Sequence, residues 1–196
     1  SKIFITHGGV GEIFVVTAVT EQGKGTKGIS AFIVTKDTTD LDKVKGFGIG
    51  HDDSLPPMPG IKSGKKEDKL GWRASDTRSL IFEDVEVPAD NLLGEEGEGF
   101  TNFMRTLDSG RVGIAALSLG IAEGAFEQSL RYSQLRKQFG QPIGSFQGIQ
   151  FQLADIATEI EAGNQPMFQA AWLARNKQPF GSKAARAKLF CYELAM

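Results

Sequence analysis

The order of strand-like and helix-like segments is the feature that most constrains the fold of this chain. In the first half, segments rich in β-branched and aromatic residues alternate with Gly-rich turns and predict strands at residues 2–6, 12–20, 28–36 and 79–87. In the second half, helical periodicity predicts helices at about residues 100–136, 146–175 and 182–196. Strands followed by helices, without alternation, predict a segregated α+β fold and exclude a Rossmann sheet.

A stretch rich in Pro, Asp, Asn and Gly, from Pro88 to Gly99, separates the two halves and has the composition of a linker. Its glycines surround glutamates whose charge would repel a pyrophosphate, so they do not form a dinucleotide fingerprint. We therefore expect two domains, residues 1–90 and 91–196. The first is expected to be an antiparallel β-barrel or a sandwich-like domain, and the second an up-and-down helical bundle.

Composition and charge exclude several classes of function. The chain has 196 residues, 40% of them hydrophobic, which suffices for a real core. Its formal net charge of -2 gives no overall attraction to nucleic acid, and no apolar run approaches the roughly 20 residues that a membrane span needs. The single cysteine, Cys191, fits a reducing compartment. Because the chain begins within a predicted strand and ends in helical rhythm, we expect it to be a fragment, truncated on both sides.

The stretch from Arg131 to Ala162 places a basic and aromatic elbow between two helices. Pro142 and its neighbouring glycines end one helical pattern, and an amphipathic pattern follows, with Ile149, Leu153, Ile156 and Ile160 at helical spacing. Arg136 and Lys137 fall in the last turn of the first predicted helix. They could bind an anion, or they could simply complement the negative end of the helix dipole.

Several motifs together resemble the acyl-CoA dehydrogenases, flavoenzymes that desaturate acyl-CoA thioesters. In chain order they are KIFITHGG, GISAFIV, GKKEDKLGWRASDTRSLIFEDVEVP, LLGEEGEGF, LDSGRVGIAALSLGIAEGA and RKQFGQPIGSFQGIQFQLADIATEIEA. The resemblance implies a middle β-domain and part of a C-terminal four-helix domain. It also implies FAD as cofactor, an acyl-CoA substrate, an electron-transfer flavoprotein as partner, and a dimer or tetramer that shares FAD sites between subunits. The expected location is the bacterial cytoplasm or the mitochondrial matrix.

Site residues follow from this resemblance position by position. Residues expected along the flavin ring are Phe4, Ile5 and Thr6, with His7 where the family usually has Asn. Residues expected to reach the FAD of a neighbouring subunit are Arg136, Gln138, Phe139 and Gln147, with the arginine at the pyrophosphate. Residues expected to line the acyl-CoA site are Asp108, Ser109, Gly110 and Arg111. From the residues alone, a plain β-strand is the favoured interpretation of the first set. An ion pair between Asp108 and Arg111 on one helix face could accompany the substrate role of the third set.

The resemblance places no catalytic base in this chain. The reaction needs a carboxylate that removes the proton alpha to the thioester carbonyl. In most members this glutamate lies in the C-terminal portion, so we expect it beyond Met196; in others it occupies the position matched here by Gly110. The glutamates that are present, among them Glu95, Glu96, Glu98, Glu159 and Glu161, are predicted to be solvated charges, and the isolated chain is predicted to be inactive.

The segment from Thr38 to Gly64 is longer than the turn of many relatives and is predicted to be a surface insertion. His51, Asp52 and Asp53 within it are interpreted as part of a solvated loop, so no metal site is predicted. Two other functions remain open for the parent protein: a flavin oxidase or monooxygenase of the same superfamily, or a non-catalytic paralogue that serves as a scaffold. The preferred acyl chain length does not follow from these residues.

Overall fold

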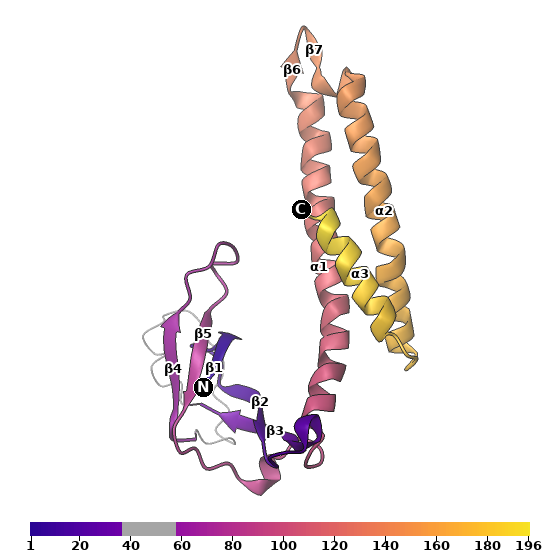
Figure 1. Cartoon of the computed structure of the whole chain (residues 1–196). Helices are drawn as coiled ribbons and strands as arrows, with labels where there is room; N and C mark the ends of the chain where they lie inside the picture. Colours follow the sequence, from indigo (N-terminus) through magenta and orange to yellow (C-terminus); the bar gives the residue numbers. More distant parts are fainter. Residues whose placement is uncertain (37–57) are drawn as a thin grey trace. The chain divides into compact units, whose positions relative to one another are not determined.

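The computed structural model describes residues 1–36 and 58–196 and divides the chain into two compact units, residues 1–102 and 103–196. Strands precede helices, as predicted, and the α+β class is confirmed (Figure 1). In the described part of the first unit the strands form two antiparallel sheets and no closed barrel. These strands are β1 (Lys2–Thr6), β2 (Ile13–Val19), β3 (Ile29–Thr35), β4 (Ile61–Lys66) and β5 (Thr77–Phe82).

The larger sheet has the order β1-β5-β4, so β5 is its central strand. Leu80 lies at the middle of β5 and is only 1% exposed, and it pairs with Lys2 on β1 and with Ser63 on β4. The sequence predicts this strand at residues 79–87, but it ends at Phe82. Asp84 adopts a positive φ of 48°, which a strand cannot continue through.

Strand β4 includes residues 61–64, which are the end of the segment predicted to be a surface insertion. Ile61 is buried and pairs with Phe82, whereas the following residues are mostly exposed. A polar edge strand rich in lysine has no hydrophobic alternation by which to recognise it. The remainder of the insertion, including His51, Asp52 and Asp53, lies outside the described residues.

The smaller sheet is a hairpin in which β2 and β3 pair in register from Ile13 with Thr35 to Val19 with Ile29. The two strands are joined by a loop that contains the short 3₁₀ helix η1 (Gly25–Gly28). Strand β3 is the more buried of the two, with Ala31 and Val34 in the core. It therefore anchors this hairpin in the first unit.

The predicted linker is not a loose connection. Leu93 N–H donates to the Ala31 carbonyl at 2.8 Å, and the Asn91 side-chain amide donates to the Ile33 carbonyl at 2.8 Å. Its short 3₁₀ helix, η3, spans Ala89–Asn91. The linker thus occupies the free edge of β3, although its composition excludes a regular strand.

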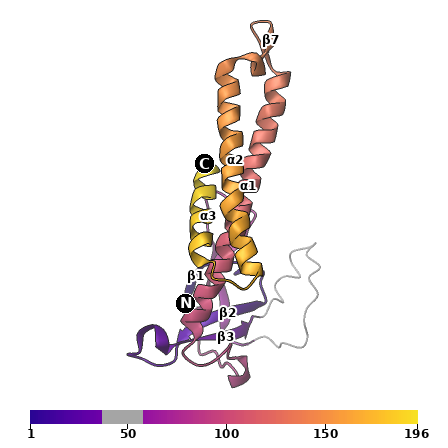
Figure 2. The ribbon, with the colours of Figure 1, turned by 90° about the vertical axis from the view of Figure 1, so that its right-hand side faces the viewer.

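The second unit contains the long helices. Helix α1 spans Gly99–Leu135, α2 spans Gln147–Arg175 and α3 spans Gly181–Leu194. Helices α1 and α2 run antiparallel beside each other, with α3 alongside them, in both views (Figures 1 and 2). Their core contains Ala115, Leu119, Met167, Ala187 and Cys191.

Small residues let these helices approach closely. A Cβ atom at Gly163 of α2 would lie 2.8 Å from Leu119 Cδ2 of α1, closer than carbon atoms pack. The predicted boundaries of α1 and α2 agree with the observed ones to within about one residue.

No helix within residues 1–36 and 58–196 is long and apolar enough to cross a membrane.

Candidate functional site

The strand β1 carries the three residues expected along the flavin ring, and its pairing is irregular. Its register with β5 shifts between Lys2 and Ile5, and Phe4 inside this bulge has a φ of 56°. The Phe4 side chain is 67% exposed and Thr6 is exposed, whereas Ile5 is partly buried. A bulge of this kind redirects side chains at a sheet edge. Phe4 and Thr6 are therefore both accessible to a ligand.

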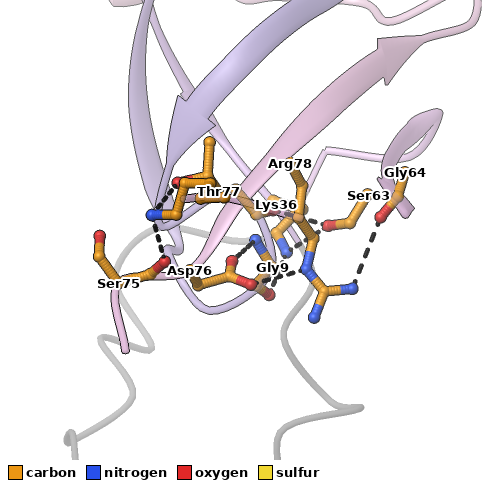
Figure 3. Close-up of polar contacts among 10 residues, drawn as sticks. Gly9, Lys36, Ser63, Gly64, Ser75, Asp76, Thr77 and Arg78 are labelled. Atoms are coloured by element: carbon orange, nitrogen blue, oxygen red, sulfur yellow. Dashed lines mark hydrogen bonds and ion pairs between the residues drawn. The ribbon is translucent and has the colours of Figure 1, made fainter. Parts of the chain in front are cut away.

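The turn after β1 is held by side chains from other segments (Figure 3). His7, which stands where the family usually has Asn, adopts a left-handed φ of 60°, a conformation that His and Asn tolerate better than most residues. The Gly9 N–H donates a 2.6 Å hydrogen bond to Asp76 Oδ2, and the His7 N–H donates to the Asp76 carbonyl at 2.8 Å. Arg78 Nε donates to the other oxygen of the same carboxylate at 2.9 Å.

The electrostatics of Asp76 follow from these contacts. Burial raises the pKa of the carboxyl, but hydrogen bonds from Arg78 and Gly9 and the positive charges of Arg78 and Lys66 outweigh that effect. The pKa of Asp76 therefore lies below its usual value. The side chain is an anion at neutral pH and accepts hydrogen bonds at both oxygens.

A buried cation completes this network. Lys36 is 5% exposed, and its Nζ donates to the Gly9 carbonyl at 2.7 Å and to Ser63 Oγ at 2.9 Å. The Ser63 hydroxyl in turn donates to the Gly8 carbonyl at 2.7 Å. No role for Lys36, Ser63 or Asp76 follows from the sequence pattern, although Asp76 lies within one of the motifs that resemble the family.

The elbow between α1 and α2 is a small hairpin of β6 (Lys137–Gln138) and β7 (Gln141–Pro142), followed by the 3₁₀ helix η4 (Ile143–Ser145). These two-residue strands were not predicted. Phe139 and Gly140 form the turn with φ values of 51° and 82°, the pattern of a type I′ hairpin turn. The Phe139 ring is 93% exposed and meets Phe146 edge-on at a centroid distance of 6.2 Å.

The predicted ligand-binding side chains of this elbow are gathered at one end of the helix pair. Arg136 follows the last residue of α1, Gln138 lies in β6, and Gln147 begins α2, and all three are exposed. The guanidinium of Arg136 makes no hydrogen bond or ion pair with any residue that the structure describes. An exposed set of one cation, two amides and an aromatic ring suits an anionic ligand with a planar ring system.

The LDSGR segment lies on α1. Arg111 and Asp108 form an ion pair through Nη1 and Oδ1, as their spacing of three residues predicts, and both side chains are partly buried. Ser109 and Gly110 are exposed, and a Cβ atom at Gly110 would meet nothing within 4 Å. The helix surface at Gly110 therefore has room for a larger side chain.

Five glutamates that the sequence predicts to be solvated lie in the linker and in helix α2. Glu95, Glu96 and Glu98 are exposed, as are Glu159 and Glu161. Within residues 1–36 and 58–196, no group of three or more His, Cys, Asp and Glu side chains could hold a metal ion. The glutamates fit the prediction of solvated charges.

Comparison with known proteins identifies the class of protein. Residues 97–196 match the family model described as "Acyl-CoA dehydrogenase, C-terminal domain". That match spans half of the chain, and the motifs in the first half resemble the same family. This chain belongs to the acyl-CoA dehydrogenase family.

Individual relatives narrow the comparison. The chain is 47% identical over 196 residues to the short-chain specific acyl-CoA dehydrogenase of Clostridium acetobutylicum. This alignment covers 100% of the present chain and 46% of that protein. It resembles the solved structure of butyryl-CoA dehydrogenase from Megasphaera elsdenii with a TM-score of 0.86 and 44% identity, covering 98% of this chain and 45% of the other. This chain therefore spans about half the length of the relatives it matches.

A further structural match concerns electron transfer. A chain from work on the electron transferring flavoprotein of Acidaminococcus fermentans and flavin-based electron bifurcation matches with a TM-score of 0.86 and 46% identity. It covers 98% of this chain, and the match spans 46% of that chain. Both structural matches extend over nearly all of the present chain.

Proposed function

We propose that the protein to which this chain belongs catalyses the FAD-dependent α,β-dehydrogenation of short-chain acyl-CoA thioesters. The observation that carries this proposal is the exposed group at the elbow, in which Arg136, Phe139 and Gln147 stand together in a member of the acyl-CoA dehydrogenase family. The short-chain preference rests on the named relatives. The domain assignment, a middle β-domain at residues 1–90 and a helical domain at residues 91–196, forms part of the proposal.

The residues present fit FAD chemically. The Arg136 guanidinium has no hydrogen-bond or ion-pair partner among the described residues and would hold the pyrophosphate, because a guanidinium can donate two parallel hydrogen bonds to phosphate oxygens. Gln138 and Gln147 would donate hydrogen bonds, and the exposed Phe139 ring would cover an aromatic face of the cofactor. Phe4, Ile5 and Thr6 would line the flavin ring, and the Thr6 hydroxyl could hydrogen-bond to a polar atom of that ring. Bound FAD would supply the hydride acceptor for the reaction.

Substrate binding falls to the LDSGR segment of α1. The Arg111 guanidinium, oriented by its ion pair with Asp108, would contact the acyl-CoA together with Ser109 and Gly110. A glutamate beyond Met196 would remove the α-proton, because Gly110 has no side chain with which to do so. The role of this chain is therefore to bind and orient cofactor and substrate, and the chain alone is expected to be inactive.

Partners and location follow the same proposal. An electron-transfer flavoprotein would accept the electrons, in keeping with one of the structural matches. FAD sites shared between subunits would require a homodimer or homotetramer. The protein would work in the bacterial cytoplasm or the mitochondrial matrix.

A turnover assay on the full-length protein tests this function. With butyryl-CoA and an artificial electron acceptor, we expect butyryl-CoA to be desaturated and the acceptor to be reduced, without oxygen consumption. Turnover that consumes oxygen in the absence of the acceptor would instead identify a flavin oxidase or monooxygenase. Absence of turnover with acyl-CoA of every chain length would identify a non-catalytic scaffold.

A further inference from the structure

We propose that Asp76, Lys36 and Ser63 are positioning residues for the flavin site: together they hold the turn after β1 and thereby set the place of Thr6. This inference rests on the proposed function, in which Thr6 contacts the flavin. It assigns a role to three side chains for which the resemblance to the family implies none.

The backbone of the turn depends on these side chains. Three of its polar groups, the Gly8 carbonyl, the Gly9 N–H and the Gly9 carbonyl, each bind a side chain from another segment. The side chains come from β4, from the residue before β5, and from the residue after β3, and they converge on the turn in Figure 3. Side chains brought from three segments fix a turn far more narrowly than its local sequence can.

The close packing around the turn leaves no room for a side chain at Gly9 and little at Gly8. A Cβ atom at Gly9 would lie 2.8 Å from Asp76 Oδ2 and would collide with the Arg78 side chain. A Cβ atom at Gly8 would lie 3.1 Å from the Ile5 carbonyl oxygen. Only glycine allows the carboxylate and the guanidinium to approach the backbone this closely.

The buried charge of Lys36 supports a specific role. An ammonium group loses its hydration when it is buried, so a buried Lys is retained only where hydrogen bonds replace the lost water. Lys36 directs its Nζ to the Gly9 carbonyl and to Ser63 Oγ. Simple filling of the core would need only an apolar side chain at this position.

The position of the turn affects Thr6 because Asp76 and Thr77, which contact the two, are adjacent in the sequence. Thr6 pairs with Thr77 in the sheet, and the neighbouring Asp76 binds Gly9. On the other side of Thr6, the bulge between Lys2 and Ile5 interrupts the register. Strand β1 is therefore irregular before Thr6 and firmly held after it, so that weakening the turn would let Thr6 shift.

The test uses the full-length protein with the substitution Asp76→Ala. We expect the apoprotein of this variant to bind FAD at least about tenfold more weakly and to shift the visible absorption of the bound flavin. We also expect a lower kcat with a nearly unchanged KM for acyl-CoA, and faster amide exchange at Gly9 in the apoprotein. Asp76→Asn, which can still accept from Gly9, is expected to recover most of the FAD affinity.

Glu83→Ala is the matched control. Glu83, the residue after β5, carries an exposed carboxylate that pairs with Lys62 of β4 at 2.6 Å and makes no hydrogen bond to the turn. We expect this variant to bind FAD as the wild type does. If Asp76→Ala fails to fold, Ser63→Ala replaces it, with FAD binding expected to weaken about three- to tenfold.

Two negative results have different meanings. If the wild type binds FAD and the folded Asp76 or Ser63 variant binds it within twofold, the positioning role is wrong and the network only stabilises the fold. If the wild type itself binds no FAD, the proposed function fails, and the positioning role fails with it.

Discussion

The carboxylate of Asp108 lies directly against the first residue of α3. A Cβ atom at Gly181 would stand 2.7 Å from Asp108 Oδ2 and 3.0 Å from its Cγ. Asp108 thus contacts the start of one helix while it forms an ion pair with Arg111 on its own helix. A residue expected at the acyl-CoA site is in this way tied to the packing of α3.

Gly181→Ala is expected to destabilise the chain by about 1 kcal/mol, because Asp108 must move and its hydrogen-bonded pair with Arg111 is disturbed. Chemical denaturation of the 196-residue chain, followed by circular dichroism, measures this loss. Gly148→Ala is the control, since it also lies at the start of a helix but would meet nothing within 4 Å. Equal effects of the two substitutions would contradict the contact with Asp108.

Arg136→Ala is expected to weaken FAD binding by the full-length protein about 10- to 100-fold, because the variant loses the charged hydrogen bonds that the guanidinium would donate to the FAD phosphates. The measurement is FAD retention and titration of the apoprotein. Lys137→Ala removes the neighbouring exposed cation and is expected to have little effect. A small loss of stability with unchanged FAD binding would favour the simpler role of Arg136 at the negative end of the α1 dipole.

The pKa of Asp76 predicts a stability change in acid. A carboxyl whose folded pKa is depressed contributes stability above its unfolded pKa of about 3.9 and loses that contribution as the pH falls through the folded pKa. The free energy of unfolding of the 196-residue chain should therefore fall below about pH 4. In Asp76→Asn that part of the acid dependence should be absent, as denaturation curves from pH 2 to pH 6 would show.

Pro166 lies inside the continuous helix α2. Proline lacks the N–H that would bond to the carbonyl four residues earlier, and its ring crowds that carbonyl. Pro166→Ala is expected to raise the free energy of unfolding by about 1 to 3 kcal/mol. Gln165→Ala, one residue away and exposed, should change it by no more than about 0.5 kcal/mol. A destabilised Pro166→Ala variant would overturn this expectation.

Local sequence patterns predicted the helices well because their ends carry strong signals. Pro142 and Gly144 stop the helical period, and α2 begins at Gln147, one residue from the predicted start. The hairpin between the helices was missed, because strands of two residues have no periodicity. Its turn at Phe139 and Gly140 could have suggested it only weakly, since Phe is unusual at a positive φ.

The network around Gly9 could not be predicted from local patterns. Lys36 is 27 residues from Gly9 in the sequence, and Asp76 is 67 residues from it. Such contacts depend on how three segments pack, and a lysine at the end of a predicted strand is normally solvated. The resemblance to a family predicts which residues contact the ligands, but it does not predict which residues would hold those side chains in place.

The linker along β3 has a consequence for handling the first unit in isolation. Its residues Asn91 and Leu93 donate hydrogen bonds to the Ile33 and Ala31 carbonyls of β3, and Met58 N–H donates to the Thr35 carbonyl of the same strand. Cutting the chain after Val87 would uncover this edge beside a hydrophobic strand, the situation in which sheets of different molecules pair and precipitate. The linker, although its composition is that of a loop, is therefore expected to protect the β-unit from aggregation.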